Sequence, residues 1–311
     1  MEEPAVAIVR SYRATDAGSG VRAVKARRVR LKKNMPAADA FRAMVLECLA
    51  QVEGNTAAIR ARNRHGVHQL RVGLRRMQMA LLSFASGVEP AALKTLSKRG
   101  RALAKLLGPA RDLDVFAEEL LPPIARKFGE DESFVALQLA VTRARRKAWS
   151  TAQGAILGPD FAALLNEVAA AAETLPPPAT NIVALSERVL EELYRKVRKR
   201  ARRSGLAYDV HMHKLRIALK KLRYAAEFFA PLYARKRSAK YLKELKRLLD
   251  DLGEANDAHG VGALLEPLGD GPQLCFAKGV VAGWYAAREK RLTRRAAEGW
   301  RAFKQLRPFW S

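Results

Sequence analysis

The chain has 311 residues, of which 57 are Lys or Arg and 31 are Asp or Glu, and its formal net charge is +26 at pH 7. Hydrophobic residues make up 49% of it, which is enough for a packed core and excludes a disordered basic tail. A charge surplus of this size attracts anions, so the candidate partners are nucleic acid, an anionic membrane surface and phosphate polymers. No stretch reaches the roughly 18 apolar residues of a spanning helix, and no signal peptide is recognisable. We therefore expect a cytoplasmic protein without a membrane partner.

Residues 1–34 differ from the rest of the chain. They alternate loosely between apolar and polar residues, with Gly18 and Gly20 between, which is typical of one or two short strands or of an extended arm. From Pro36 onward the periodicity is helical, and one weak strand signal remains near Val280. The sequence therefore predicts an all-α protein with a short non-helical N-terminal arm. The first expected helices run from Pro36 to about Arg62, from Val67 to Phe84, from Pro90 to Leu107 and from Ala110 to Leu121.

An internal repeat divides the helical part. The segment HQLRVGLRRMQMALLSF at 68–84 aligns with HKLRIALKKLRYAAEFF at 213–229, and the same offset places LGPARD at 107–112 on LGEAND at 252–257. The triple proline at 176–178 is the best candidate for a boundary between the two copies. We expect two bundles of the four-helix type, at residues 35–175 and 179–311, related by a pseudo-two-fold axis.

On a helical wheel, both copies of the first repeated segment have an apolar face and a cationic face. The apolar positions are Leu70, Leu74, Met77, Leu81 and Phe84, and in the second copy Leu215, Leu219, Leu222, Ala226 and Phe229. The cationic positions are His68, Arg71 and Arg75 with Arg76 beside them, and then His213, Arg216, Lys220, Arg223 and Tyr224 with Lys221 beside them. Arg binds phosphate oxygens as a bidentate fork and Lys as a mobile point charge. The pattern therefore favours a phosphate-binding surface.

A second cationic stripe lies on the following helix of each half. A single basic helix face is usually only solvated surface, but four such stripes related by a repeat indicate a continuous anion-binding surface. The first stripe lies within about 60° of an ideal helix. The members of the two stripes are Lys94, Lys98, Arg101 and Lys105, and then Lys240, Lys243, Lys246 and Arg247.

Two pairs of repeated residues have alternative interpretations. His68 and His213 could begin helices or bind a metal, but no Asp, Glu or Cys follows either histidine at i+3 or i+4, so no metal site is expected. Asp112 and Asp257 either cap helix starts or orient neighbouring arginine side chains.

The sequence does not predict an enzyme. It contains no P-loop, GxSxG, HExxH or paired-carboxylate motif, so no catalytic residue and no cofactor are expected. Cys48 and Cys275 have neither metal-ligand nor disulfide spacing. Both lie among apolar neighbours, and we expect them to pack in the core.

With these segments in view, the chain resembles the conserved histidine α-helical domain family, CHAD. The resemblance rests on GVHQLRVGLRRMQMALLSF and LGPARDLDVFAEEL in the first half and on HKLRIALKKLRYAAEFF and LKRLLDDLGEANDAH in the second, and covers roughly residues 35–311. It implies two helical bundles with a basic cleft or pore between them, non-catalytic binding of inorganic polyphosphate and, in bacteria, association with polyphosphate granules and their proteins. CHAD domains often follow a CYTH domain, so residues 1–34 are the tail of such a domain, a strand arm or a basic extension.

The family's signature positions fall on the cationic residues of the two repeated helices, namely His68, Arg71, Arg75, Arg76, His213, Arg216, Lys220, Lys221, Arg223 and Tyr224. The stripe argument extends the expected site to Lys94, Lys98, Arg101, Lys105, Lys243 and Lys246. Met79 stands where the second copy has Tyr224. The alternative function is binding to the phosphate backbone of nucleic acid, which the scarcity of aromatic residues on the basic faces disfavours. Weak nonspecific affinity for nucleic acid is expected in either case.

Overall fold

The structure is a computed structural model, and it describes residues 21–85, 90–174, 181–203 and 210–311. These residues are mostly helical and contain no strand, which confirms the predicted all-α class. In the first half the elements are α2 (Ala37–Glu53), α3 (Thr56–Arg60), α4 (Arg64–Phe84), α5 (Pro90–Leu106), α6 (Gly108–Val115), the π-helical turn η1 (Phe116–Leu120), α7 (Pro122–Phe128), α8 (Glu132–Leu157) and α9 (Pro159–Thr174). In the second half they are α10 (Ile182–Ala201), α11 (Val210–Phe229), η2 (Ala230–Leu232), α12 (Arg235–Leu265), η3 (Glu266–Leu268) and α13 (Pro272–Phe303).

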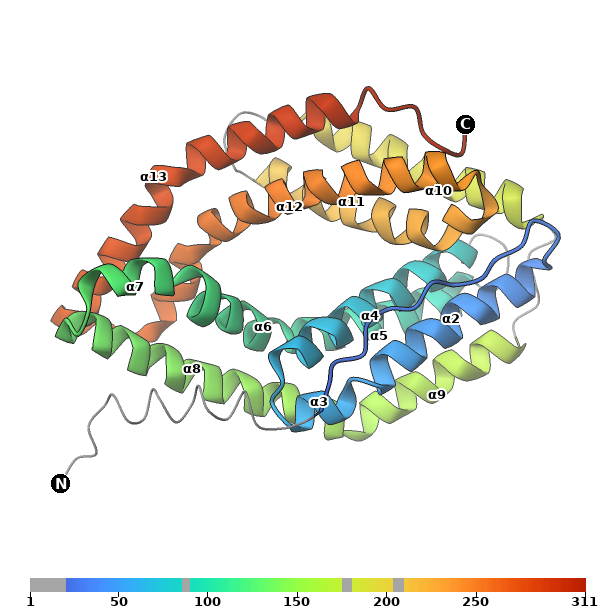
Figure 1. The fold of residues 1–311 in the computed structure, drawn as a ribbon. Coiled ribbons are helices and arrows are strands. Elements are labelled where there is room, and N and C mark those ends of the chain that lie inside the picture. Colours follow the sequence, from blue (N-terminus) through green and yellow to red (C-terminus); the bar gives the residue numbers. More distant parts are fainter. Residues whose placement is uncertain (1–20, 86–89, 175–180, 204–209) are drawn as a thin grey trace.

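The helices form two groups that meet at the repeated segments (Figure 1). In the first group α4 packs between α2 and α5, and in the second α11 packs between α10 and α12. Helices α4 and α11 also contact each other, so the two copies of the first repeated segment lie side by side. The main hydrophobic core is continuous through this contact, from Leu70 and Leu74 on α4 to Leu219 and Phe228 on α11.

A second junction joins the groups at their far ends. Phe116, Ile124 and Phe134 from the first half pack with Leu265 and Val281 from the second, in a separate apolar cluster. Figure 1 shows this junction where α7 and α8 meet α13. The two groups are thus held together at two separate places.

The helical wheel identified the core positions correctly. All the apolar positions that were expected to face inward on the two repeated helices are buried, from Leu70 to Phe84 and from Leu215 to Phe229. Each of the two helices packs against several elements of its own half and against the other repeated helix. Burial of each such Leu or Phe side chain stabilises the fold by about 2 kcal/mol.

Three local predictions need correction. The expected helix from Pro36 to Arg62 is broken at Gly54 and Asn55 into α2 and α3, because the Asn55 side chain bonds the backbone of Gln51 and Val24. The weak strand signal near Val280 is wrong, since this residue lies inside α13.

The third correction concerns the cysteines. Cys48 is buried in the core as expected, and burial raises the pKa of its thiol to about 12. Cys275 is exposed instead. It lies in the first turn of α13, and its Sγ donates to the carbonyl of Asp270 at 3.4 Å.

The first described residues form an extended segment, residues 21–32, which we call the strap. The strap has no strand partner among the described residues and is held by side chains instead. Asn55 accepts a bond from Val24 N at 3.0 Å and donates to Val24 O at 2.8 Å, and Asn63 donates to Val21 O at 2.9 Å. Val29 is buried in the main core. The strap therefore runs in a fixed position along α2 and α4 (Figure 1).

Candidate anion-binding site

The contact between α4 and α11 brings cations from both repeats together. Arg216 on α11 and Arg75 and Arg71 on α4 lie close enough to Lys220 for their charges to disfavour its protonation. Burial is the larger cause, and together these effects lower the pKa of Lys220 to about 7, against the partial opposition of Asp257. We call Arg71, Arg75, Arg216 and Lys220 the crossing cluster. Its positive potential is incompletely neutralised by the protein.

Arg71 is fixed by the loop that opens α6. Its Nη1 donates to Gly108 O at 2.7 Å and to Leu107 O at 3.2 Å, and lies 3.6 Å from Asp112 Oδ1. Burial lowers the pKa of Arg71 to about 10, so the group remains a cation at neutral pH. Asp112 lies within α6 and pairs with this guanidinium, which is the orienting role and not the helix-capping one.

Arg216, the counterpart of Arg71, is held less tightly. Nothing lies within 4 Å of a Cβ built on Gly253, whereas a Cβ on Gly108 would meet Arg71 Nη1 at 3.5 Å. The buried Nε of Arg216 has no hydrogen-bond partner among the described residues. A buried N–H donor without a partner is costly, so the protein itself does not satisfy the hydrogen-bonding capacity of Arg216.

The paired histidines have different environments. Burial, followed by the charges of Arg111, Arg71 and Arg75, lowers the pKa of His68 to about 4, so His68 is neutral at pH 7. His213 is exposed, and its Nδ1 lies 3.1 Å from Asn256 Oδ1. If His68 contacts a phosphate, it would therefore donate a hydrogen bond from a neutral ring N–H.

Two pockets flank this region and share Arg223 and Tyr224. The first, which we call the inner pocket, has a volume of about 320 Å³ and lies between α11 and α12. Its lining includes Arg216, Lys220 and Asp257. The second, the strap pocket, has a volume of about 590 Å³ and lies among the strap, α4, α11 and α12.

Arg76 does not lie on the cationic surface where the wheel placed it. It is 3% exposed, and its guanidinium donates to Gln51 Oε1 at 2.8 Å and to Arg27 O at 3.2 Å. The same guanidinium lies over the Phe228 ring, 5.0 Å from the centroid. Arg76 thus connects α2, the strap and α11, and the expected solvent-facing position is corrected to an interior one.

The remaining predicted residues of α11 divide between surface and core. Tyr224 was expected opposite the core, but it is buried in the main cluster while its edge lines both pockets. Arg223 Nε donates to Glu227 Oε1 at 2.7 Å. Lys221 points to another side, where burial and then Arg101 and Lys196 lower its pKa.

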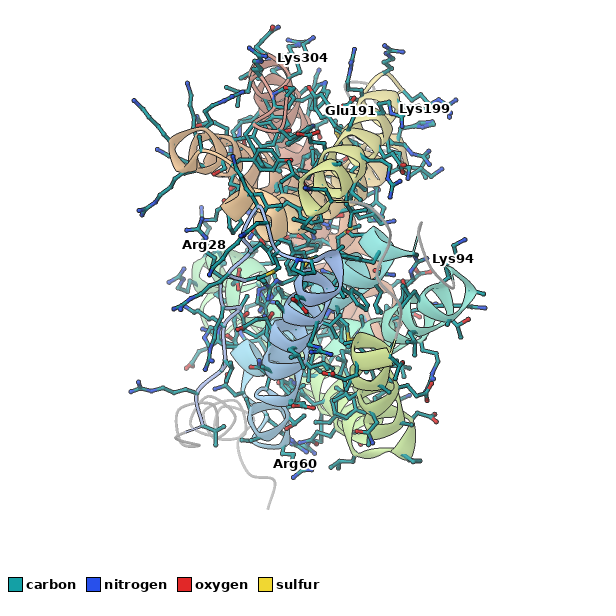
Figure 2. All side chains as sticks on the ribbon, turned by 90° about the vertical axis from the view of Figure 1, so that its right-hand side faces the viewer. Arg28, Arg60, Lys94, Glu191, Lys199 and Lys304 are labelled. Carbon is teal, nitrogen blue, oxygen red and sulfur yellow. The ribbon has the colours of Figure 1, made fainter. Side chains whose placement is uncertain are left out.

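The two outer stripes are exposed, as a solvated anion-binding face requires. Lys94 is on the opposite side of the molecule from Arg28 of the strap (Figure 2). On α12, Lys246 lies 4.0 Å from Asp250. The structure brings Arg101 near Lys221, and Asp250, the partner of Lys246, lines the inner pocket. The exposed stripe members of the predicted site, besides Arg101, are Lys94, Lys98, Lys105, Lys243 and Lys246.

The sequence patterns did not identify several residues that line or support this anion-binding region. The strap cations Lys25, Arg27 and Arg28 line the strap pocket, although the sequence showed them only as a run of basic residues before the first helix. Buried Asp114 accepts from Arg145 Nη2 at 2.8 Å and from Trp149 Nε1 at 3.1 Å, which fixes α6 against α8. The short motif at 112–114, with an acid on either side of Leu113, was the available signal.

No group of three or more His, Cys, Asp or Glu side chains in the described ranges is placed to hold a metal ion. No single helix in them is long and apolar enough to cross a membrane, and α8 and α9 meet those criteria only as a pair that is bent by 49°.

Comparison with known proteins gives matches of two kinds. The model of the CHAD domain family matches residues 43–266. A crystal structure of the CHAD domain from the plant Ricinus communis has a TM-score of 0.80 and 28% identity, covering 93% of this chain and 98% of that one. PptA from Streptomyces chartreusis shares the fold, with a TM-score of 0.68 and 17% identity over 86% of this chain and all (100%) of that one. No curated protein matches the chain.

Proposed function

The chain belongs to the CHAD domain family, and from that premise we propose that it binds inorganic polyphosphate at the crossing cluster. The observation that carries the proposal is the meeting of the two repeated cationic faces, with Arg71 and Arg75 opposite Arg216 and Lys220. Only phosphate oxygens are needed to satisfy such a site. A linear phosphate polymer offers them at short intervals without bulk between them.

Base recognition has little support at this site. Among the described residues that line the two pockets, Tyr224 is the one aromatic, and it is 9% exposed. Proteins that hold single strands of nucleic acid stack the bases on accessible aromatic side chains. We therefore rank polyphosphate before nucleic acid as the ligand.

We propose further that binding leaves the polymer intact and that the protein serves at polyphosphate granules. Incubating the protein with polyphosphate and a divalent metal ion tests the first point. An unchanged distribution of chain lengths on a gel is the expected result, and progressive shortening would instead make the protein an enzyme.

The direct test of binding is a calorimetric titration with polyphosphates of graded length. Affinity is expected to rise with chain length and to fall with salt, because cation–phosphate contacts release counterions from a polyelectrolyte. Binding that is independent of both length and salt would contradict contact along a polymer.

Lys220 makes binding dependent on pH. Its pKa is about 7 in the free protein, and an adjacent phosphate favours the charged form and raises that pKa. Binding should therefore take up a proton, about half a proton from this group at pH 7. Affinity should fall as the pH rises from 6 to 8.5, because the free lysine becomes neutral over that range.

Titrations in buffers of different ionisation enthalpy measure this uptake. The matched variant is Lys220→Arg, which keeps the charge but does not titrate in this range. Its proton uptake should be smaller than that of the wild type by the lysine's share. Equal uptake in both proteins would remove Lys220 from the site.

A further inference from the structure

We propose that the strap completes a second phosphate-binding subsite, the strap pocket, which takes the same polymer onward from the crossing cluster. This rests on the proposed function and adds a segment to its site. The strap, residues 21–32, precedes the part of the chain that the family model matches, which begins at residue 43. The strap is therefore the part of the subsite that lies outside the matched region, and the helical lining of the pocket lies within it.

The lining of the strap pocket is strongly cationic. It includes six Lys or Arg side chains and one carboxylate among the described residues, and Glu227 is that carboxylate. Glu227 accepts a hydrogen bond from Arg223 Nε at 2.7 Å, so its negative charge is already paired. The six cations are Lys25, Arg27, Arg28, Arg76, Arg223 and Arg235.

These cations differ in whether they have hydrogen-bond or ion-pair partners within the protein. Arg76 and Arg223 are bonded to Gln51, the strap backbone and Glu227. Lys25, Arg28 and Arg235 are exposed, and no carboxylate of the described residues pairs with them. Unpaired like charges around one concave surface repel one another. An anion in the pocket would relieve that repulsion.

The strap backbone is fixed where its cations are needed. The bonds from Asn55 to Val24 and from Arg76 to Arg27 O hold it on either side of Lys25, and Val29 anchors it just after Arg28. Figure 2 shows Arg28 at the height where the two groups of helices meet. The side chains therefore start from a fixed backbone, which lowers the entropy lost on binding.

The strap pocket and the inner pocket are neighbours. Both are lined by Arg223 and Tyr224. The strap pocket is also lined by His68, whose pKa is lowered by burial and by the charges of Arg111, Arg71 and Arg75. A ligand that is longer than the crossing cluster can therefore contact both pockets. This favours a linear phosphate polymer over a second, separate small anion.

Two double variants, one within the strap and one at its end, test the proposal. Lys25→Gln with Arg28→Gln removes two exposed charges that line the pocket, and Lys32→Gln with Lys33→Gln removes two exposed charges nearby that do not. The net charge is the same in both variants, so long-range attraction is matched. The probes are long-chain polyphosphate and tripolyphosphate, titrated by calorimetry at two salt concentrations, with helical content and thermal midpoint checked by circular dichroism.

The expected result is specific to chain length. For the long polymer, the Lys25/Arg28 variant should bind about tenfold more weakly than the Lys32/Lys33 variant and show a shallower salt dependence. For tripolyphosphate the two variants should agree, because a short chain occupies the crossing cluster alone. Equal affinities of the two variants for the long polymer would overturn the strap subsite and leave the proposed function standing. Absence of long-polymer binding by the wild type would overturn both.

Discussion

Replacing Arg75, Arg216 and Lys220 with Ala together is expected to weaken the binding of long-chain polyphosphate by at least a hundredfold. Each charge-assisted hydrogen bond to a phosphate contributes about 1.5 kcal/mol or more, which is about tenfold in affinity. Arg71 stays in place because it also bonds Leu107 O and Gly108 O, and its loss would disturb the start of α6. The measurement is a calorimetric titration near physiological salt.

A matched triple variant separates the site from the overall charge. Arg60→Ala, Lys199→Ala and Lys304→Ala also remove three cationic side chains, and these three are exposed. Figure 2 shows them at the periphery of the molecule. This control should lose no more than a few fold in affinity, through weaker long-range attraction. Similar losses in the two triple variants would mean that the polymer reads net charge and not the crossing cluster.

Replacing Arg76 with Met is expected to lower the free energy of unfolding by about 3 kcal/mol. The change removes two hydrogen bonds from a buried guanidinium and its contact with the Phe228 ring, and each such bond contributes about 1.5 kcal/mol. It also leaves Gln51 Oε1 without this donor in the interior. Urea unfolding followed by circular dichroism measures the loss.

The control for this variant is Arg30→Met, an exposed strap residue. It should change stability by less than about 0.5 kcal/mol. Hydrogen exchange of the strap gives a second measure, since Arg76 holds Arg27 O and its loss should speed exchange at residues 24–28. A stability loss under 1 kcal/mol in the Arg76 variant would show that the interior bonds contribute little.

The sequence predicted the helical class and the core of the repeated helices because period and amphipathicity are local properties. Leu70, Leu74, Leu215 and Leu219 are buried where the wheel placed them. The meeting of the cationic faces was also expected, from the repeat and the family resemblance. Helices α4 and α11 contact each other, and the binding role of their cationic faces stays a prediction.

The burial of Arg76 and Tyr224 could not be derived from a helical wheel. A wheel separates two faces of one helix, but it does not show which further segments cover the flanks. The strap and Phe228 cover Arg76, and both come from parts of the chain distant from α4. Tyr224 is likewise buried by contacts outside its own helix.

The repeat also concealed a difference between the halves. Pro109 is the second residue of α6, which follows a break after α5, whereas Glu254 at the aligned position lies inside the continuous helix α12. Proline lacks the N–H that a helix interior needs, so the first copy must break where the second continues. At this break the carbonyls of Leu107 and Gly108 accept hydrogen bonds from Arg71 Nη1. The aligned residues of the second copy lie inside α12, so the surroundings of Arg71 and Arg216 differ although the sequences align.

The most direct test of the central claim is a competition titration. Wild-type protein is titrated with long-chain polyphosphate near physiological salt, where exposed charges more than about 8 Å apart are largely screened, with duplex DNA of equal phosphate content as the competitor. Tight binding that excess DNA does not displace is the predicted result, because the proposed site needs only phosphate oxygens at short intervals. Binding to DNA that equals or exceeds binding to polyphosphate would contradict the claim and make the protein a nucleic-acid backbone binder.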